Sequence, residues 1–253
     1  MTVATLLVQG AGYPPLLAAC LLARFAPCTS RIALSSTGSL SEDVIIRPAE
    51  FKALNAIGLQ RAELLKAGAQ AATKDGSAPT GQDNPRADEL TISAHTYEAL
   101  LASVASRADI HRDPSDPDVI FDTDTQNIEK TSQIPIGLGR HCLPSVRHVS
   151  IIQGTMDAVF ALPRDWSDQT EIQELKRRAQ RSTGNIRDMI SLLSGTEASE
   201  TLQHRIDVWL AMGRVCPFDD DPFSVHEWSS VMHATVGEPK AQSLFSARRR
   251  ARA

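Results

Sequence analysis

The chain has 253 residues, 42% of them hydrophobic, which is enough to bury the core of one large domain or two small ones. Its net charge of −4 argues against a protein that binds nucleic acid through overall positive charge. No apolar run is long enough to span a bilayer, and the N-terminal apolar run lacks the basic segment that opens a signal peptide. The sequence therefore predicts a cytoplasmic protein that contacts neither nucleic acid nor a membrane.

Four cysteines are spread along the chain, at Cys20, Cys28, Cys142 and Cys216. None forms a C-x-x-C motif, and none is paired with a histidine at the spacing of a metal site. His226 and His233 lie seven residues apart, but no third ligand is near them in the sequence. We therefore predict no metal site, and cysteines used in this way are typical of a reducing compartment.

The first 36 residues predict a β-α-β unit. A short apolar run at 3–9 precedes Gly10-Ala11-Gly12, an apolar helical pattern follows over 16–25, and a second apolar run stands at 32–34. A dinucleotide is normally held at such a turn, because glycines let the backbone approach the pyrophosphate, whose charge lies at the helix N-terminus. Gly10, Ala11 and Gly12 are therefore candidate cofactor contacts.

This dinucleotide fingerprint is damaged in two places. Pro15 stands where G-x-G-x-x-G has its third glycine, and it removes one possible N–H donor to a phosphate. The second strand ends in Ser35-Ser36, where an acidic residue would accept hydrogen bonds from the ribose hydroxyls, and the next carboxylate is Glu42. The alternative interpretation is a structural β-α-β unit that kept its shape and lost its ligand.

The rest of the chain predicts an α/β fold, with a Rossmann-like β-α-β core followed by a mostly helical C-terminal half. We expect a loop at 74–88, a helix at 97–105 and a buried strand at 118–122. Further helices are expected at 154–162, 168–194, 200–212 and 224–235. The predicted domains are an FAD-binding-type α/β domain at 1–153, a helical region at 154–245 and a disordered basic tail at 246–253.

Several short motifs along the chain resemble those of one enzyme family, the flavin-dependent tryptophan halogenases. Residues 118–123 resemble the family's D-L-F-I-D strand, and Ile136-Gly137-Leu138-Gly139 resembles its A-I-G-L-A segment. The C-terminal region of the family reads I-R-D-F, then a helix ending in G-R, an acidic turn, and a Trp before G-x-x-P. The matching residues here are Ile186-Arg187-Asp188, Gly213-Arg214, Asp219–Phe223, Trp228 and Gly237-Glu238-Pro239.

The resemblance implies FAD as the cofactor. The family binds FAD at its N-terminal β-α-β unit, which makes Gly10, Ala11 and Gly12 the implied contacts, together with Gly137 and Gly139. The flavin-side motif G-x-G-E-A-T has no match in this chain. FAD therefore stays a candidate cofactor with weak support from the sequence.

The residues that carry halogenation in the family are missing. Segment 141–148 takes the place of L-E-P-L-E-S-T, whose glutamate acts as base or orienter, and Val146 or Arg147 stands at that glutamate. Neither side chain replaces a carboxylate as base. Lys74 falls near the family's relay lysine, but its surroundings are typical of a solvated loop. The W-x-W-x-I-P motif is absent, the chain is shorter than family members, and no catalytic residue is assigned.

Three functions remain open on the sequence. The first is a shortened, degenerate relative of the halogenases, a pseudoenzyme that acts as a binding or partner protein beside an intact relative or a second copy of itself. The second is an FAD-dependent oxidoreductase of the halogenase or monooxygenase type with altered chemistry, because FAD itself activates oxygen. The third is a purely structural or interaction role. Whether the chain is an enzyme is therefore not decided by its sequence.

Overall fold

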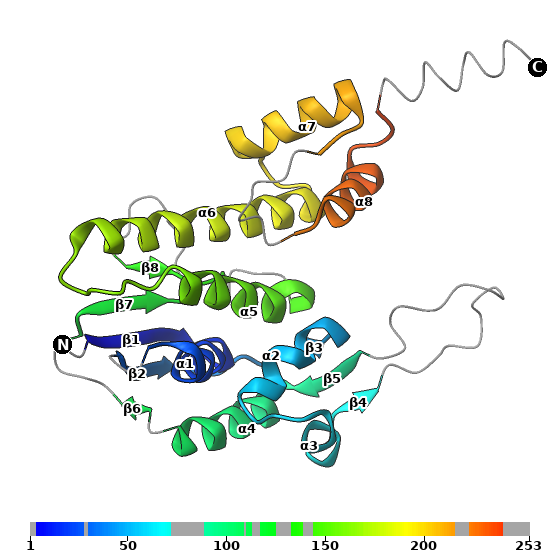
Figure 1. Ribbon diagram of the computed structural model, residues 1–253. Coiled ribbons are helices and arrows are strands. Elements are labelled where there is room, and N and C mark those ends of the chain that lie inside the picture. The colour runs from blue at the N-terminus through cyan, green and yellow to red at the C-terminus, as the bar shows by residue number, and fades with distance from the viewer. Residues whose placement is uncertain are drawn as a thin grey trace, which may run out of the picture. The chain divides into compact units, whose positions relative to one another are not determined.

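A computed structural model of the chain describes residues 4–27, 30–71, 89–108, 110–112, 117–124, 133–138, 144–215 and 223–239 (Figure 1). The chain forms two compact units, Met1–Thr183 and Gly184–Ala253. The domain limits at 153 and 245 that the sequence suggests stay a prediction. Among the described residues, no helix is both long and apolar enough to cross a membrane.

A five-stranded parallel sheet forms the centre of the first unit. Its strand order is β6-β2-β1-β7-β8, and the predicted strand at 118–122 is β7. Leu6, Val8 and Phe121 are fully buried in it, as expected for a parallel sheet that is covered on both faces. The strands are β1 (Ala4–Ala11), β2 (Ser30–Thr37), β6 (His111–Arg112), β7 (Val119–Asp122) and β8 (Ile134–Pro135).

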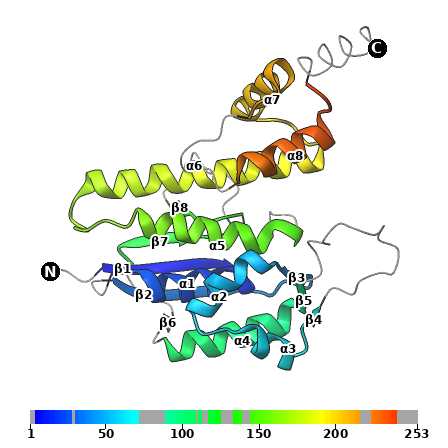
Figure 2. The same cartoon turned by 45° about the vertical axis from the view of Figure 1, so that its right-hand side comes forward.

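The predicted β-α-β unit is confirmed. Helix α1 (Tyr13–Phe25) connects β1 to β2, and the two strands pair in parallel from Ala4 opposite Ser30 to Ala11 opposite Thr37. The helix is apolar on nearly every side because α4 (Ala94–Arg107) and α5 (Pro144–Phe160) also pack against it (Figures 1 and 2). The predicted α/β fold class is therefore confirmed.

A small antiparallel sheet, β3-β5-β4, stands beside this core. Its central strand is β5 (Leu90–Ser93), which pairs with β3 (Asp43–Ile46) and β4 (Gln70–Ala71). The sequence analysis predicted neither β4 nor β5, and its loop at 74–88 lies outside the described residues. The links between these strands hold η1 (Pro48–Glu50), α2 (Phe51–Ala56) and α3 (Arg61–Lys66).

The second unit is helical, as predicted. It contains the end of α6 (Gln169–Ser194), then α7 (Glu200–Met212) and α8 (Val225–Thr235). Ser199 caps the start of α7, and Gly213 ends it in the left-handed region at φ 66°. Ser224 and Glu227 form a capping box at the start of α8.

Trp228 is the centre of this second unit. Its indole is fully buried, the Arg205 guanidinium lies 4.3 Å from the ring centroid, and the Phe223 ring meets it edge to face at 6.0 Å. The Trp209 indole N–H donates to the carbonyl of Gly237 at 3.0 Å, which ties α7 to the chain after α8. Phe223, Trp228 and Gly237, which are among the residues that carried the family resemblance, therefore have structural roles.

We expect Trp228→Ala to lower the free energy of unfolding by about 3–5 kcal/mol, because it empties a buried aromatic site and leaves the Arg205 guanidinium without the ring. The measurement is urea denaturation followed by circular dichroism. The matched control is Val225→Ala on the same helix, whose side chain is 47% exposed. Equal losses for the two variants would contradict this account of the core.

Candidate functional site

The turn between β1 and α1 is where the sequence predicts a cofactor. Gly10 has φ 152° and Gly12 has φ 67°, a backbone that L side chains rarely adopt. Gly12 is the N-cap of α1, and Tyr13, Pro14 and Pro15 follow as its first three residues. Since proline has no N–H, the first turn of this helix offers fewer donors to a phosphate than an ordinary helix N-terminus.

A carboxylate of the chain itself binds the turn. The Ala11 N–H donates to Oδ2 of Asp124 at 2.9 Å, and the Asp124 N–H donates to Oδ1 of Asp122 at 2.8 Å. Two unit charges 4 Å apart interact by about 4 kcal/mol at the effective dielectric near a protein surface. Asp124 therefore takes a donor that a pyrophosphate would use, and its charge repels one.

Side chains of the chain also fill the space beside both glycines. A Cβ atom on Gly10 would lie 2.0 Å from Oγ1 of Thr123, and one on Gly12 would lie 2.8 Å from Cγ of Leu40. The buried Thr123 hydroxyl donates to the carbonyl of Gln9 at 3.2 Å. Close packing within the chain thus accounts for glycine at positions 10 and 12 without a bound ligand.

The end of β2 presents hydroxyl groups where the fingerprint has an acid. The Ser36 hydroxyl donates to the carbonyl of Gly12 at 3.1 Å, and the Thr37 hydroxyl donates to the carbonyl of Gly10 at 3.4 Å. These bonds hold the end of β2 against the turn. The polar groups around Gly10 and Gly12 are therefore largely satisfied by the chain.

The second predicted glycine segment follows β8, which β7 separates from β1 in the sheet. A Cβ atom on Gly137, where φ is 67°, would lie 2.7 Å from Cδ1 of Ile151 and 3.1 Å from the carbonyl oxygen of Ser150. Gly154 approaches the same backbone from α5. Gly137 is thus needed for packing on α5, and Gly139 lies outside the described residues.

The segment that replaces the family's glutamate is helical. Helix α5 begins at Pro144, ten residues before the start predicted from the sequence, and both Val146 and Arg147 are buried. The Arg147 guanidinium forms an ion pair with Glu42 at 2.5 Å. The structure therefore places an aliphatic side chain and a paired cation where the resemblance would place a carboxylate.

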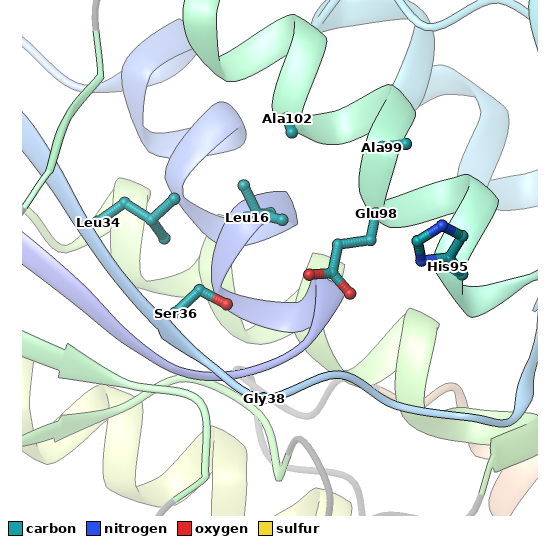
Figure 3. Close-up of a pocket in the computed structure, with 8 residues that line it drawn as sticks. All are labelled: Leu16, Leu34, Ser36, Gly38, His95, Glu98, Ala99 and Ala102. Carbon is teal, nitrogen blue, oxygen red and sulfur yellow. The ribbon is translucent and has the colours of Figure 1, made fainter.

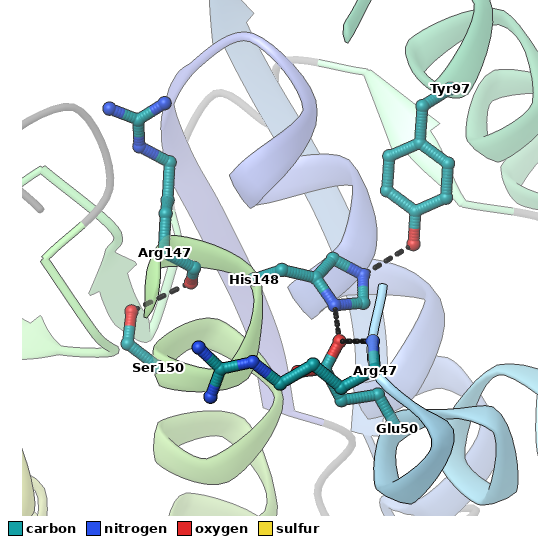
Figure 4. A network of polar contacts seen from close by, with 6 residues as sticks. All are labelled: Arg47, Glu50, Tyr97, Arg147, His148 and Ser150. Atoms are coloured by element: carbon teal, nitrogen blue, oxygen red, sulfur yellow. Dashed lines mark hydrogen bonds and ion pairs between the residues drawn. The ribbon is translucent and has the colours of Figure 1, made fainter. Parts of the chain in front are cut away.

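A buried polar network lies beside this segment (Figure 4). Nε2 of His148, on α5, shares a hydrogen bond with the Tyr97 hydroxyl at 2.7 Å, and its Nδ1 contacts Oε2 of Glu50. The same carboxylate oxygen accepts from the N–H of Arg47 at 3.2 Å. Burial holds the pKa of Tyr97 well above its usual value, so its hydroxyl keeps its proton. The network joins α4, α5 and η1, and the sequence analysis did not find it.

A pocket of about 370 Å³ lies between α1, α4 and the end of β2 (Figure 3). Glu98 lines it, a residue that was not predicted as part of a site, because its place within the expected helix at 97–105 gives no signal of a pocket. The full lining consists of Leu16, Leu34, Ser36, Gly38, His95, Glu98, Ala99 and Ala102. Among the described residues of the chain, no group of three His, Cys, Asp or Glu side chains is arranged to hold a metal ion.

Comparison with known proteins gives a fold. No family model and no curated protein matches the sequence. Among solved structures, BrvH, a flavin-dependent halogenase from Brevundimonas sp. BAL3, matches with a TM-score of 0.62 and 11% identity over 94% of this chain and 91% of that chain. Xcc4156, a flavin-dependent halogenase from Xanthomonas campestris, matches with a TM-score of 0.63 and 11% identity over 95% and 90%.

A tryptophan 6-halogenase from Streptomyces toxytricini, SttH, matches with a TM-score of 0.59 and 8% identity over 94% of this chain and 91% of that chain. The chain therefore has the fold of the flavin-dependent halogenases. The resemblance predicted from the sequence is confirmed at the level of the fold. The roles predicted for Gly10, Ala11, Gly12, Gly137 and Gly139 as cofactor contacts stay a prediction.

We expect Tyr97→Phe to lower the free energy of unfolding by about 1–3 kcal/mol, since it leaves a ring nitrogen of buried His148 without its partner. The phenylalanine keeps the ring contact with Tyr13, so packing is not the cause. Chemical denaturation measures the change. Ser106→Ala, which removes an exposed hydroxyl from the same helix, should change the stability by less than about 0.5 kcal/mol, and a similar loss in both variants would refute the role of the network.

Proposed function

We propose that this chain is a shortened, degenerate relative of the flavin-dependent tryptophan halogenases that has no halogenase activity and acts as a binding or partner protein. The observation that carries the proposal is the Asp124 carboxylate on the Ala11 N–H, at the turn where the fold would hold the pyrophosphate of FAD. The residues of this turn do not fit that group. No step of flavin chemistry is therefore assigned to them.

Three features of the turn oppose the binding of FAD. Pro14 and Pro15 remove two N–H groups from the helix N-terminus. Displacing Asp124 costs a hydrogen bond to a charged acceptor, about 1.5–3 kcal/mol, and leaves its charge beside the incoming phosphates. Ser36 offers no carboxylate to a ribose. A flavin would have to overcome all three, so tight binding is not expected.

The substrate side supports the same proposal. Halogenation in this family depends on a carboxylate beside the substrate, and the corresponding segment of this chain supplies buried Val146 and Arg147. The Arg147 guanidinium is paired with Glu42 and has no acid–base function near neutral pH. A protein without a flavin and without this carboxylate has neither half of the halogenation chemistry.

A partner role needs surface that the fold leaves uncovered. Phe160, at the end of α5, is 78% exposed, and it borders a hollow of about 390 Å³ with Leu162 and Pro163. Exposed aromatic side chains of this kind are enriched where proteins meet. We propose an intact halogenase relative or a second copy of the chain as the partner, and co-elution in size-exclusion chromatography distinguishes the two.

The second candidate is an FAD-dependent oxidoreductase with altered chemistry. It is favoured by the parallel β1-α1-β2 unit, in which Gly10 and Gly12 have positive φ angles. The chain with this unit has the fold of flavin-dependent halogenases. This candidate requires that Asp124 leave the turn when FAD binds. The two candidates therefore differ in a single measurable property, the affinity for FAD.

We expect the purified protein to be colourless and to show no bound-flavin spectrum after incubation with excess FAD and desalting. With a flavin reductase, NADH, halide and tryptophan, no halogenated product should form above the level without the protein. A flavin spectrum that survives desalting would overturn the loss of the cofactor. Halogenated tryptophan or another halogenated indole would overturn the loss of activity.

Asp124→Ala should raise the weak affinity for FAD about tenfold or more, because it frees the Ala11 N–H and removes the repulsive charge. Quenching of flavin fluorescence during a titration measures the affinity. Asp118→Ala is the matched control, since Oδ2 of Asp118 accepts from the Thr5 N–H at 2.7 Å near the opposite end of β1. Equal FAD affinities for the two variants would show that Asp124 does not close the turn.

A further inference from the structure

Helix α6 belongs to both compact units of the chain. It runs from Gln169 to Ser194, while the first unit ends at Thr183 and the second begins at Gly184. The four residues at this boundary, Ser182-Thr183-Gly184-Asn185, all form helix less readily than the alanine, glutamine and arginine residues of the turn before them. The intrinsic preference for helix is therefore low at the point of α6 where the two units divide.

Glycine at position 184 is not required by the surrounding structure. Its φ is not positive, and a Cβ atom added there meets nothing within 4 Å outside the backbone of its own helix. Gly184 differs in this from Gly137, which packing on α5 requires. An alanine would fit at position 184 without strain. Because glycine has the greatest backbone freedom, it favours the helical state about fivefold less than alanine does.

The side chains of α6 just before Gly184 are bound to the first unit. The buried Ser182 hydroxyl donates to Oδ2 of Asp157, on α5, at 2.6 Å. The buried Thr183 hydroxyl donates to the carbonyl of Pro135, on β8, at 3.4 Å. These two bonds hold the helix to the body of the first unit up to its last residue.

The side chains just after Gly184 are bound to the second unit. Oδ1 of buried Asn185 accepts from Nη2 of Arg205, on α7, at 3.0 Å. Oδ1 of Asp188 accepts from the hydroxyl of Ser199, the N-cap of α7, at 2.7 Å. The hydrogen-bond partners of α6 thus change from one unit to the other across a single residue, and that residue has no side chain.

We propose that Gly184 is a hinge, at which α6 bends and about which the second unit turns relative to the first. Helices kink at glycine and serine, and hinges are formed by a few residues that absorb changes of φ and ψ. A bend at Gly184 leaves the side-chain hydrogen bonds on both sides of it intact, because each of them lies within one unit. The hinge does not depend on whether the turn after β1 holds a cofactor.

The test is to measure residual dipolar couplings of the ¹⁵N-labelled full chain in a weakly aligning medium and to fit an alignment tensor to each unit separately. Motion about a hinge averages the couplings of the two units differently, so the two tensors should differ in magnitude. Two units fixed to each other share one alignment, and tensors of equal magnitude in the wild-type protein would therefore overturn the proposal. No flavin enters the experiment, so this failure would leave the proposed function unaffected.

Gly184→Ala identifies the residue responsible. It should bring the magnitudes of the two tensors closer together, and it should slow hydrogen exchange of the amides at 185–188 about fivefold, the factor by which alanine favours the helix. The matched control is Gln173→Ala, which places the same residue at an exposed position of α6 inside the first unit. It should leave the two tensors as they are in the wild-type protein. An unchanged difference between the tensors in Gly184→Ala, with a native circular dichroism spectrum, would overturn the role of Gly184.

Discussion

The hydrogen bond from the Ala11 N–H to the Asp124 carboxylate joins the turn after β1 to the chain after β7. A helix N-terminus at the end of a parallel strand attracts negative charge, and in dinucleotide-binding folds that charge belongs to the ligand. Here a side chain from the end of β7 supplies it. The negative charge that the turn attracts is thus supplied within the chain.

The glycines of the turn and of the segment after β8 are required by packing within the chain. Gly10 and Gly12 leave room for Thr123 and Leu40, and Gly137 leaves room for α5. A larger residue at any of these positions would collide with the chain itself, so packing preserves them even where no cofactor is bound. A glycine pattern in the sequence therefore predicts the conformation of the backbone. Whether a ligand binds there depends on the side chains that surround the glycines.

The elements of the fold that depend on local sequence were predictable, and the pairing of distant strands was not. Apolar periodicity and two glycines predicted the β-α-β unit, and the apolar run at 118–122 predicted β7. The antiparallel sheet was missed because β4 has only two residues and its partner strand β5 begins 19 residues further along the chain, at Leu90. Helix α5 was predicted too short, because its first residues belong to the segment 141–148 that resembles a catalytic motif of the family.

The site was harder to predict, because its decisive residues are distant in the sequence. Asp124 lies 113 residues after Ala11, in a polar stretch without a pattern, and Glu98 lies within a helix far from the strand end that it faces. Composition and spacing do not report such pairs. The sequence showed Pro15, which has no N–H, and Ser36 at the place of an acid, and the structure adds the Asp124 carboxylate on the Ala11 N–H.

The most direct measurement is an NMR titration of the ¹⁵N-labelled full chain with FAD, in which the backbone amides of Gly10, Ala11 and Gly12 are followed. If Asp124 closes the turn, the Ala11 amide exchanges slowly with solvent, and none of the three amides shifts at millimolar FAD. Saturable shifts of these amides, with faster exchange at Ala11 during the titration, would mean that the pyrophosphate displaces Asp124 and that the cofactor site works.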